Sequence, residues 1–172
     1  TEYLDVLKSI GGNSIRTWST DNAMQILDEA HANGISVCLG LWVGHERHGF
    51  NYNDEYSISA QLKAFEKDII KYKDHPALLM WAIGNEVDLF YKNFGVWNAV
   101  EDIAKMIKKL DPNHPTMTVT AGIDAAEVFM IKKYCPSIDI LGINTYGGIN
   151  NLSNQVRMFG WEKPYMVTEW GP

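Results

Sequence analysis

The sequence predicts an α/β fold of the (β/α)8 barrel type, the TIM barrel, of which these 172 residues form an incomplete part. Two observations predict repeated βα units. Short apolar runs alternate with amphipathic segments throughout, and the runs lack the polar alternation of a half-exposed strand. A third observation selects the barrel, because polar and aromatic residues gather where nearly every apolar run ends, as they do at the active-site end of such barrels.

Six short runs rich in Ile, Val, Leu and Met are predicted to be strands that are buried on both faces of a parallel sheet. In chain order they are Asn13–Trp18, Ile35–Val43, Ala77–Gly84, Thr116–Thr120, Ile138–Asn144 and Tyr165–Glu169.

The segments between these runs are predicted to be amphipathic helices, because apolar residues recur in them every three or four positions. Two stripes carry this spacing most clearly, Ile58, Leu62, Phe65 and Ile69 in one segment and Val96, Val100, Ile103, Ile107 and Leu110 in the next.

The ends of one helix are marked by the residues that flank it. We expect Thr20 or Asp21 to cap the N-terminus of a helix over Ala23–Asn33, because a side-chain oxygen there accepts a hydrogen bond from the first turn. Gly34 follows the same helix and is expected to end it in the left-handed conformation.

A doubly wound sheet is the alternative to a barrel for repeated βα units. Such sheets usually carry a glycine-rich phosphate-binding turn after the first strand, and the sequence has neither GxGxxG nor a P-loop. A full barrel has eight strands in about 250 residues. We therefore expect a single partial barrel domain over residues 1–172, comprising strands two to seven and lacking the first and the eighth.

Composition excludes several classes of protein. A net charge of −6 without any basic run argues against binding to nucleic acid or to an anionic membrane. No apolar stretch reaches the roughly 18 residues that span a bilayer. Cys38 and Cys135 are expected to be buried reduced thiols, because two cysteines do not make a disulfide framework. Localisation stays open, with export to the periplasm or the cell exterior as one alternative.

Two of the predicted strands run into a glutamate, Glu86 after Ala77–Gly84 and Glu169 at the end of Tyr165–Glu169. A carboxylate at the mouth of a buried strand is costly to desolvate unless something there uses it. Because the carboxyl ends of parallel strands face one cleft, the two side chains are expected to form an acid/base pair. Paired carboxylates about 5–5.5 Å apart hydrolyse glycosidic bonds with retention.

Four segments together resemble the strand signatures of clan A glycoside hydrolases. Trp-Ala-Ile-Gly-Asn-Glu at 81–86, Gly-Ile-Asn-Thr-Tyr-Gly at 142–147 and Val-Thr-Glu-Trp-Gly at 167–171 resemble those of strands four, six and seven, and Ser-Ile-Arg-Thr-Trp at 14–18 that of strand two. The catalytic barrel of family two is the most similar, with family five as its neighbour. The order and spacing of the segments carry this resemblance over nearly the whole chain.

The resemblance implies a retaining β-glycosidase that needs no cofactor. In that scheme Glu86 is the general acid/base and Glu169 the nucleophile. Asn85 is implied to hold the 2-hydroxyl of the sugar, Tyr146 to orient Glu169, and Arg16 to keep Glu169 ionised.

The remaining candidates are substrate contacts. The resemblance implies that Trp42 and His45 shape the floor of the subsite, and Asn144 is a weaker candidate. Flat rings stack on the C–H face of a sugar, which makes Trp18 and Trp170 candidates for carbohydrate binding. We further expect Glu86, placed beside Trp81 and other apolar bulk, to be the carboxyl that stays protonated.

Three other functions are alternatives. The segment His45-Glu46-Arg47-His48 raises the question of a metal, but no further ligand cluster is evident and no metal is predicted. A transglycosylase would use the same residues with a sugar as the attacking group. A non-catalytic barrel that binds carbohydrate is the more distant alternative. The sugar, the linkage, the choice between oligosaccharide and polysaccharide, and the oligomeric state stay open.

Overall fold

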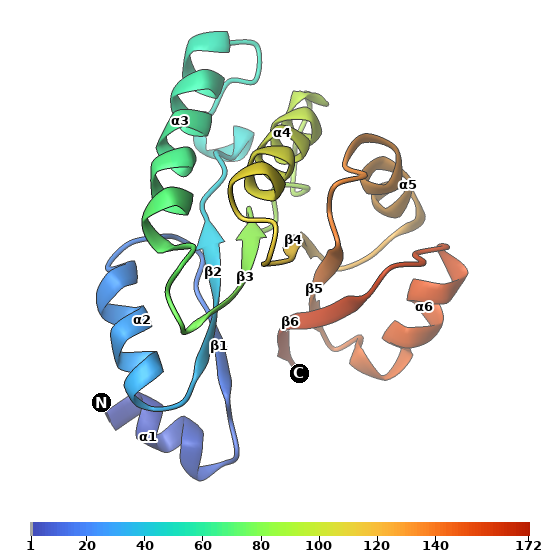
Figure 1. Ribbon diagram of the computed structural model, residues 1–172. Coiled ribbons are helices and arrows are strands. Elements are labelled where there is room, and N and C mark those ends of the chain that lie inside the picture. The colour runs from blue at the N-terminus through green and yellow to red at the C-terminus, as the bar shows by residue number, and fades with distance from the viewer. Residues whose placement is uncertain (1) are drawn as a thin grey trace.

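The computed structural model describes residues 2–172 and has one parallel sheet surrounded by helices (Figure 1). The six strands follow one another in the order β1-β2-β3-β4-β5-β6, and every neighbouring pair is parallel. Their bounds are β1 Ser14–Arg16, β2 Ser36–Leu41, β3 Leu78–Ile83, β4 Thr116–Ala121, β5 Ile140–Tyr146 and β6 Tyr165–Gly171. The structure thus confirms all six predicted strands, with ends that differ by at most two residues.

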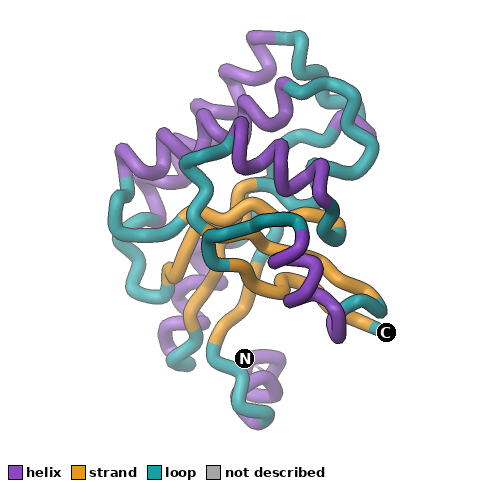
Figure 2. Tube along the Cα trace, turned by 90° about the vertical axis from the view of Figure 1, so that its right-hand side faces the viewer, coloured by secondary structure: helices purple, strands orange, loops and turns teal. Residues whose placement is uncertain are grey.

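Helices connect the strands and cover the outer side of the sheet, as the views in Figure 1 and Figure 2 agree. They are α1 Glu2–Ser9, α2 Ala23–Ala32, α3 Glu55–Tyr72, α4 Gly95–Leu110, α5 Ala125–Tyr134 and α6 Leu152–Met158, with short 3-10 helices η1 Glu46–His48 and η2 Ile149–Asn151. None of the helices within residues 2–172 combines the length and the apolar character that crossing a bilayer requires.

The alternation of side chains along each strand divides the core into two layers. Val37, Leu39 and Trp81 face the helices and belong to the larger layer, together with the buried stripe of α4. Cys38 and Met117 face the other way and pack in a small inner cluster with residues of β3 and β4. A filled interior of this kind is the packing of a (β/α) barrel.

The two edge strands of the sheet approach each other. Arg16 ends β1, Glu169 lies in β6, and their side chains form an ion pair with an N···O distance of 2.5 Å. The six strands therefore form a nearly closed, incomplete TIM barrel, as the sequence predicts.

The predicted cap of α2 is wrong. Asn22 precedes the helix in the left-handed conformation, with φ 54° and no capping side-chain hydrogen bond. Thr20 and Asp21 are engaged elsewhere, since the Thr20 hydroxyl donates to Asp68 and Asp21 accepts from Ser19. The expected glycine after the helix is confirmed, because Gly34 has a φ of 67°.

Both cysteines are free and buried, as expected. Burial raises the pKa of the Cys38 thiol and of the Cys135 thiol to about 12, so both stay protonated at neutral pH. Neither thiol has the ionised character that a nucleophile needs.

Candidate active site

An irregularity between the last two strands positions Glu169. Ile143 pairs with Val167, but the next residue, Asn144, pairs with Glu169, so that Thr168 is an extra residue in β6. A bulge of this type changes the direction in which the following side chains point. It sets Glu169 directly across from Asn144 at the carboxyl end of the sheet.

Three donors hold the Glu169 carboxylate. Its Oε1 accepts from Arg16 Nη2 at 2.5 Å and from Trp18 Nε1 at 3.0 Å. Its Oε2 accepts from the Tyr146 hydroxyl at 2.7 Å. Hydrogen bonds to an ionised acceptor are the strong class, and together these three fix the direction of the carboxylate.

A tight turn after β3 positions Glu86. Gly84 has a φ of 74°, and a Cβ there would lie 2.9 Å from Val87 Cγ1, so the turn needs glycine. Glu86 itself has a φ of 55°, and its N–H donates to the Val119 carbonyl of β4 at 2.9 Å. A non-glycine residue in this region is strained, and such strain is often found at functional sites.

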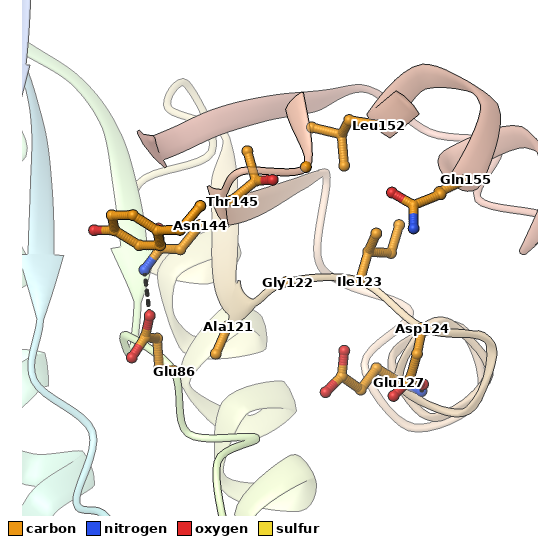
Figure 3. Close-up of a pocket in the computed structure, with 12 residues that line it drawn as sticks. Glu86, Ala121, Gly122, Ile123, Asp124, Glu127, Asn144, Thr145, Leu152 and Gln155 are labelled. Carbon is orange, nitrogen blue, oxygen red and sulfur yellow. Dashed lines mark hydrogen bonds between the residues drawn. The ribbon is translucent and has the colours of Figure 1, made fainter. Parts of the chain in front are cut away.

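The Glu86 carboxylate has fewer partners than that of Glu169. Asn144 Nδ2 donates to its Oε1 at 2.8 Å (Figure 3). Arg47 Nη2 lies 3.9 Å from its Oε2. The two glutamate side chains are almost equally accessible, at 20% for Glu86 and 21% for Glu169. Their environments therefore differ in hydrogen bonding and charge rather than in exposure.

Two buried amides connect the glutamates. Asn85 Oδ1 accepts from Arg16 Nη1 at 3.2 Å and from Asn144 Nδ2 at 3.3 Å. The Thr168 hydroxyl donates to Asn144 Oδ1 at 2.7 Å, which orients the Asn144 amide so that its nitrogen faces Glu86. Arg16, Asn85 and Asn144 thus form a continuous network from one carboxylate to the other.

The expected neighbourhood of Glu86 is wrong in one respect. Trp81 is fully buried in the core, and its indole N–H donates to Asp111 at 2.8 Å. Asp111 follows α4 and precedes β4, so Trp81 faces the helical layer. The hydrogen-bond and ion-pair partners of Glu86 are instead Asn144 and Arg47.

Trp42, His45 and His48 form a stack of nearly parallel rings. The Trp42 and His45 ring centroids lie 4.7 Å apart, and those of His45 and His48 lie 5.1 Å apart. His45 is only 3% exposed, and neither ring nitrogen has a hydrogen-bond partner within the described residues. Burial, followed by the charge of Arg47, lowers the pKa of His45 to about 4, so the ring is neutral at neutral pH.

Three of the predicted aromatic contacts lie at the site, and Trp170 does not. Trp18 reaches Glu169 directly, and Trp42 joins the ring stack with 39% of its surface exposed. Tyr146 is 62% exposed and bonds Glu169. Trp170 is 72% exposed and pairs with Thr145, one residue beyond Glu169, so it points away from this network.

A second pair of carboxyls lies beyond Glu86. Asp88 is 7% exposed, accepts from the Ala121 N–H at 3.0 Å and is hydrogen-bonded to Glu127 of α5. Burial, followed by the charge of Asp88, raises the pKa of Glu127 to about 8. Because Ala121 donates to Asp88, we assign the shared proton of this pair to Glu127 at neutral pH.

No group of three or more potential metal-binding side chains comes together in residues 2–172. The predicted residues Arg16, Asn85, Glu86, Asn144 and Glu169 do come together. Sequence reasoning missed Arg47, Thr168 and Glu127 as site residues. Arg47 lies two positions from His45, which is the one signal that could have identified it.

Two carboxylates at the strand ends of a barrel are the pair of groups that most glycosidases use. The particular family follows from comparison. The chain belongs to the glycosyl hydrolases family 2, TIM barrel domain, whose profile matches residues 4–172.

Curated relatives are similar to this chain over nearly all of its length. The β-glucuronidase of Chlorocebus aethiops is 26% identical over 97% of the chain and 26% of its own length. The β-glucuronidase of Paenibacillus borealis is 27% identical over 97% of the chain and 30% of its own length. The chain therefore spans less than a third of each relative.

Solved structures share the fold. The β-glucuronidase of Bifidobacterium dentium, in complex with coumarin-3-O-glucuronide, has a TM-score of 0.76 at 22% identity and covers 98% of this chain and 29% of its own. The β-D-glucuronidase of Dictyoglomus thermophilum has a TM-score of 0.75 at 22% identity over 97% of this chain and 31% of its own.

Proposed function

We propose that this chain is part of the catalytic barrel of a retaining glycosidase that hydrolyses β-linked glycosides by double displacement. The observation that carries the proposal is that two almost equally exposed glutamates differ in the number of hydrogen bonds that they accept. Glu169 accepts from three donors, while Glu86 accepts from one amide. A carboxylate held by three donors is suited to act as the ionised nucleophile, and the other is left to carry a proton.

The first step forms a covalent intermediate. Glu86 transfers its proton to the glycosidic oxygen while Glu169 attacks the anomeric carbon from the opposite face. The bond between carbon and the leaving oxygen breaks, and the leaving group departs as an alcohol. Arg16, Trp18 and Tyr146 keep the attacking oxygens in position, since each donates to Glu169 in the resting site.

The second step releases the sugar. Glu86, now ionised, removes a proton from a water molecule whose oxygen attacks the anomeric carbon, and Glu169 leaves as a carboxylate. Each step inverts the configuration of the anomeric carbon, so the two steps together retain it. Asn85 supports this chemistry because its known partners use only Oδ1, which leaves its Nδ2 to donate to the hydroxyl beside the reacting carbon.

The substrate is a carbohydrate, oligomeric or polymeric. The names of the curated relatives make a β-glucuronide the first glycone to test, ahead of gluco, galacto and manno sugars. The partly exposed rings of Trp18 and Trp42 support sugar binding, because their faces can pack on C–H groups.

Substitution of the acid/base tests the proposal. Glu86→Ala should lower kcat/KM about 10²–10⁴-fold for glycosides with poor leaving groups. For a dinitrophenyl glycoside, which departs without a proton, added azide should restore turnover and yield the β-glycosyl azide. Glu162→Ala is the matched control, since Glu162 is 81% exposed and pairs with Lys132. A protein that binds the glycoside unchanged but never turns it over would instead be a binding barrel, which would refute the proposal.

A further inference from the structure

A pocket of about 470 Å³ opens beside the acid/base glutamate (Figure 3). One wall consists of Glu86, Asn144 and Tyr146. The other consists of the loop after β4 and residues from α5 and α6, among them Ile123, Asp124, Glu127, Leu152 and Gln155. Glu169 is not one of the lining residues.

The position of this pocket relative to the two glutamates gives it a role. In double displacement the leaving oxygen faces the acid, and the nucleophile lies on the opposite face of the anomeric carbon. A leaving group must therefore extend from the acid and away from the nucleophile. Since Glu86 lines the pocket and Glu169 does not, the pocket lies where the leaving group extends.

The chemistry of the walls limits what can occupy the pocket. Three acidic side chains line it, Glu86, Asp124 and Glu127, and no lysine or arginine does. Even with Glu86 and Glu127 protonated, the pocket offers an anionic leaving group no cation to pair with and leaves it beside the carboxyl of Asp124. An uncharged group that carries hydroxyls would instead find both donors and acceptors.

Two side chains are placed to bind such hydroxyls. Glu127 reaches into the pocket from α5, and the Gln155 amide reaches toward it from α6 (Figure 3). Glu127 is also hydrogen-bonded to the buried Asp88, which fixes its direction and leaves its second oxygen to accept from a ligand. Ile123 supplies apolar surface that the C–H face of a sugar can cover.

We infer that this pocket is the subsite for the leaving group and that Glu127 and Gln155 select an uncharged, hydroxyl-bearing leaving group, such as a second sugar, over an anionic or a purely aromatic one. The inference rests on the proposed function, because it uses Glu86 as the acid.

The test compares two leaving groups on one glycone. Gln155→Leu should lower kcat/KM about three- to tenfold for a β-linked disaccharide, because one or two hydrogen bonds to hydroxyls are lost. For the phenyl glycoside of the same sugar, kcat/KM should change less than about twofold, because that leaving group makes no such bonds. Ser153→Ala, an exposed position on the same helix, is the control and should leave both values unchanged.

A second variant guards against misfolding. Glu127→Met removes the acceptor and should shift the same ratio of the two kcat/KM values in the same direction, whereas Glu127→Gln keeps a donor toward Asp88 and an acceptor toward the ligand and should leave the ratio unchanged. Both should have a far-ultraviolet circular dichroism spectrum like that of the parent. If Gln155→Leu and Glu127→Met both leave the ratio unchanged while the parent turns over both substrates, the inference is wrong and the proposed function stands. If the parent turns over neither glycoside, the proposed function itself is wrong.

Discussion

Substitution of Thr168 tests how the site positions Glu86, the proposed general acid. The Thr168 hydroxyl contacts neither glutamate, but it donates to Asn144 Oδ1 at 2.7 Å, and Asn144 Nδ2 donates to Glu86 at 2.8 Å. Thr168→Val keeps the branched shape and removes the hydroxyl. The Asn144 amide then loses the contact that orients it, and Glu86 loses a positioned donor.

The expected loss of activity follows from the free energy that one neutral hydrogen bond contributes. Such a bond contributes about 0.5–1.5 kcal/mol, which corresponds to about a two- to tenfold fall in rate. The loss should fall on the step that needs the acid. We therefore expect kcat/KM to fall by this factor for a phenyl glycoside, and to change less than about twofold for a dinitrophenyl glycoside, which leaves without protonation.

Thr168→Ser is the matched control, because it keeps the hydroxyl and should retain the activity of the parent with both substrates. Steady-state kinetics with the two glycosides at one pH measure the effect. An equal fall with both leaving groups would mean that Thr168 acts through packing or through Glu169. No fall with either would mean that the Asn144 amide does not depend on it.

Three further outcomes are expected. Trp18→Phe keeps an aromatic ring but removes the indole N–H that donates to Glu169 at 3.0 Å, so kcat/KM should fall about tenfold with both leaving groups, as steady-state kinetics would measure. Glu127→Gln should flatten the pH dependence of stability. The pKa of Glu127 is about 8 in the folded protein and 4.5 ordinarily, so the parent should lose about 1–2 kcal/mol of stability, after solvent screening, as pH rises between these values. The variant should not lose it, as urea titrations at several pH values would measure. Gly84→Ala should lower the free energy of unfolding by about 1–3 kcal/mol in the same titration, because φ is 74° and the new Cβ meets Val87.

The strands and the central network could be predicted from the sequence because their signals are local. Apolar runs define the strands, and Asn85, Glu86 and Glu169 stand at the ends of such runs. Parallel pairing then brings strand ends together whatever the details of the loops. The position of Arg16 beside Glu169 was implied by the resemblance to clan A glycoside hydrolases, and the ion pair agrees with it.

The contacts that the sequence did not reveal depend on tertiary geometry. Glu127 occupies the first turn of α5, where an acidic residue is ordinary, and only the packing of Asp88 against it gives it a role. The extra residue Thr168 in β6 has no signal in the alternation of a buried strand. Trp81 was misplaced relative to Glu86 because the direction of a side chain depends on the register of the strand, which apolar runs do not encode.

Intact mass spectrometry after incubation with 2-deoxy-2-fluoro-β-glycosides tests the central claim most directly. These substrates form the covalent intermediate and release it slowly. For the matching glycone, we expect the protein to gain the mass of one fluorosugar, to carry it on the peptide that contains Glu169, and to gain nothing in Glu169→Gln. Hydrolysis of the natural glycoside without any adduct on Glu169, or an adduct on Glu86, would contradict the assignment of Glu169 as the nucleophile.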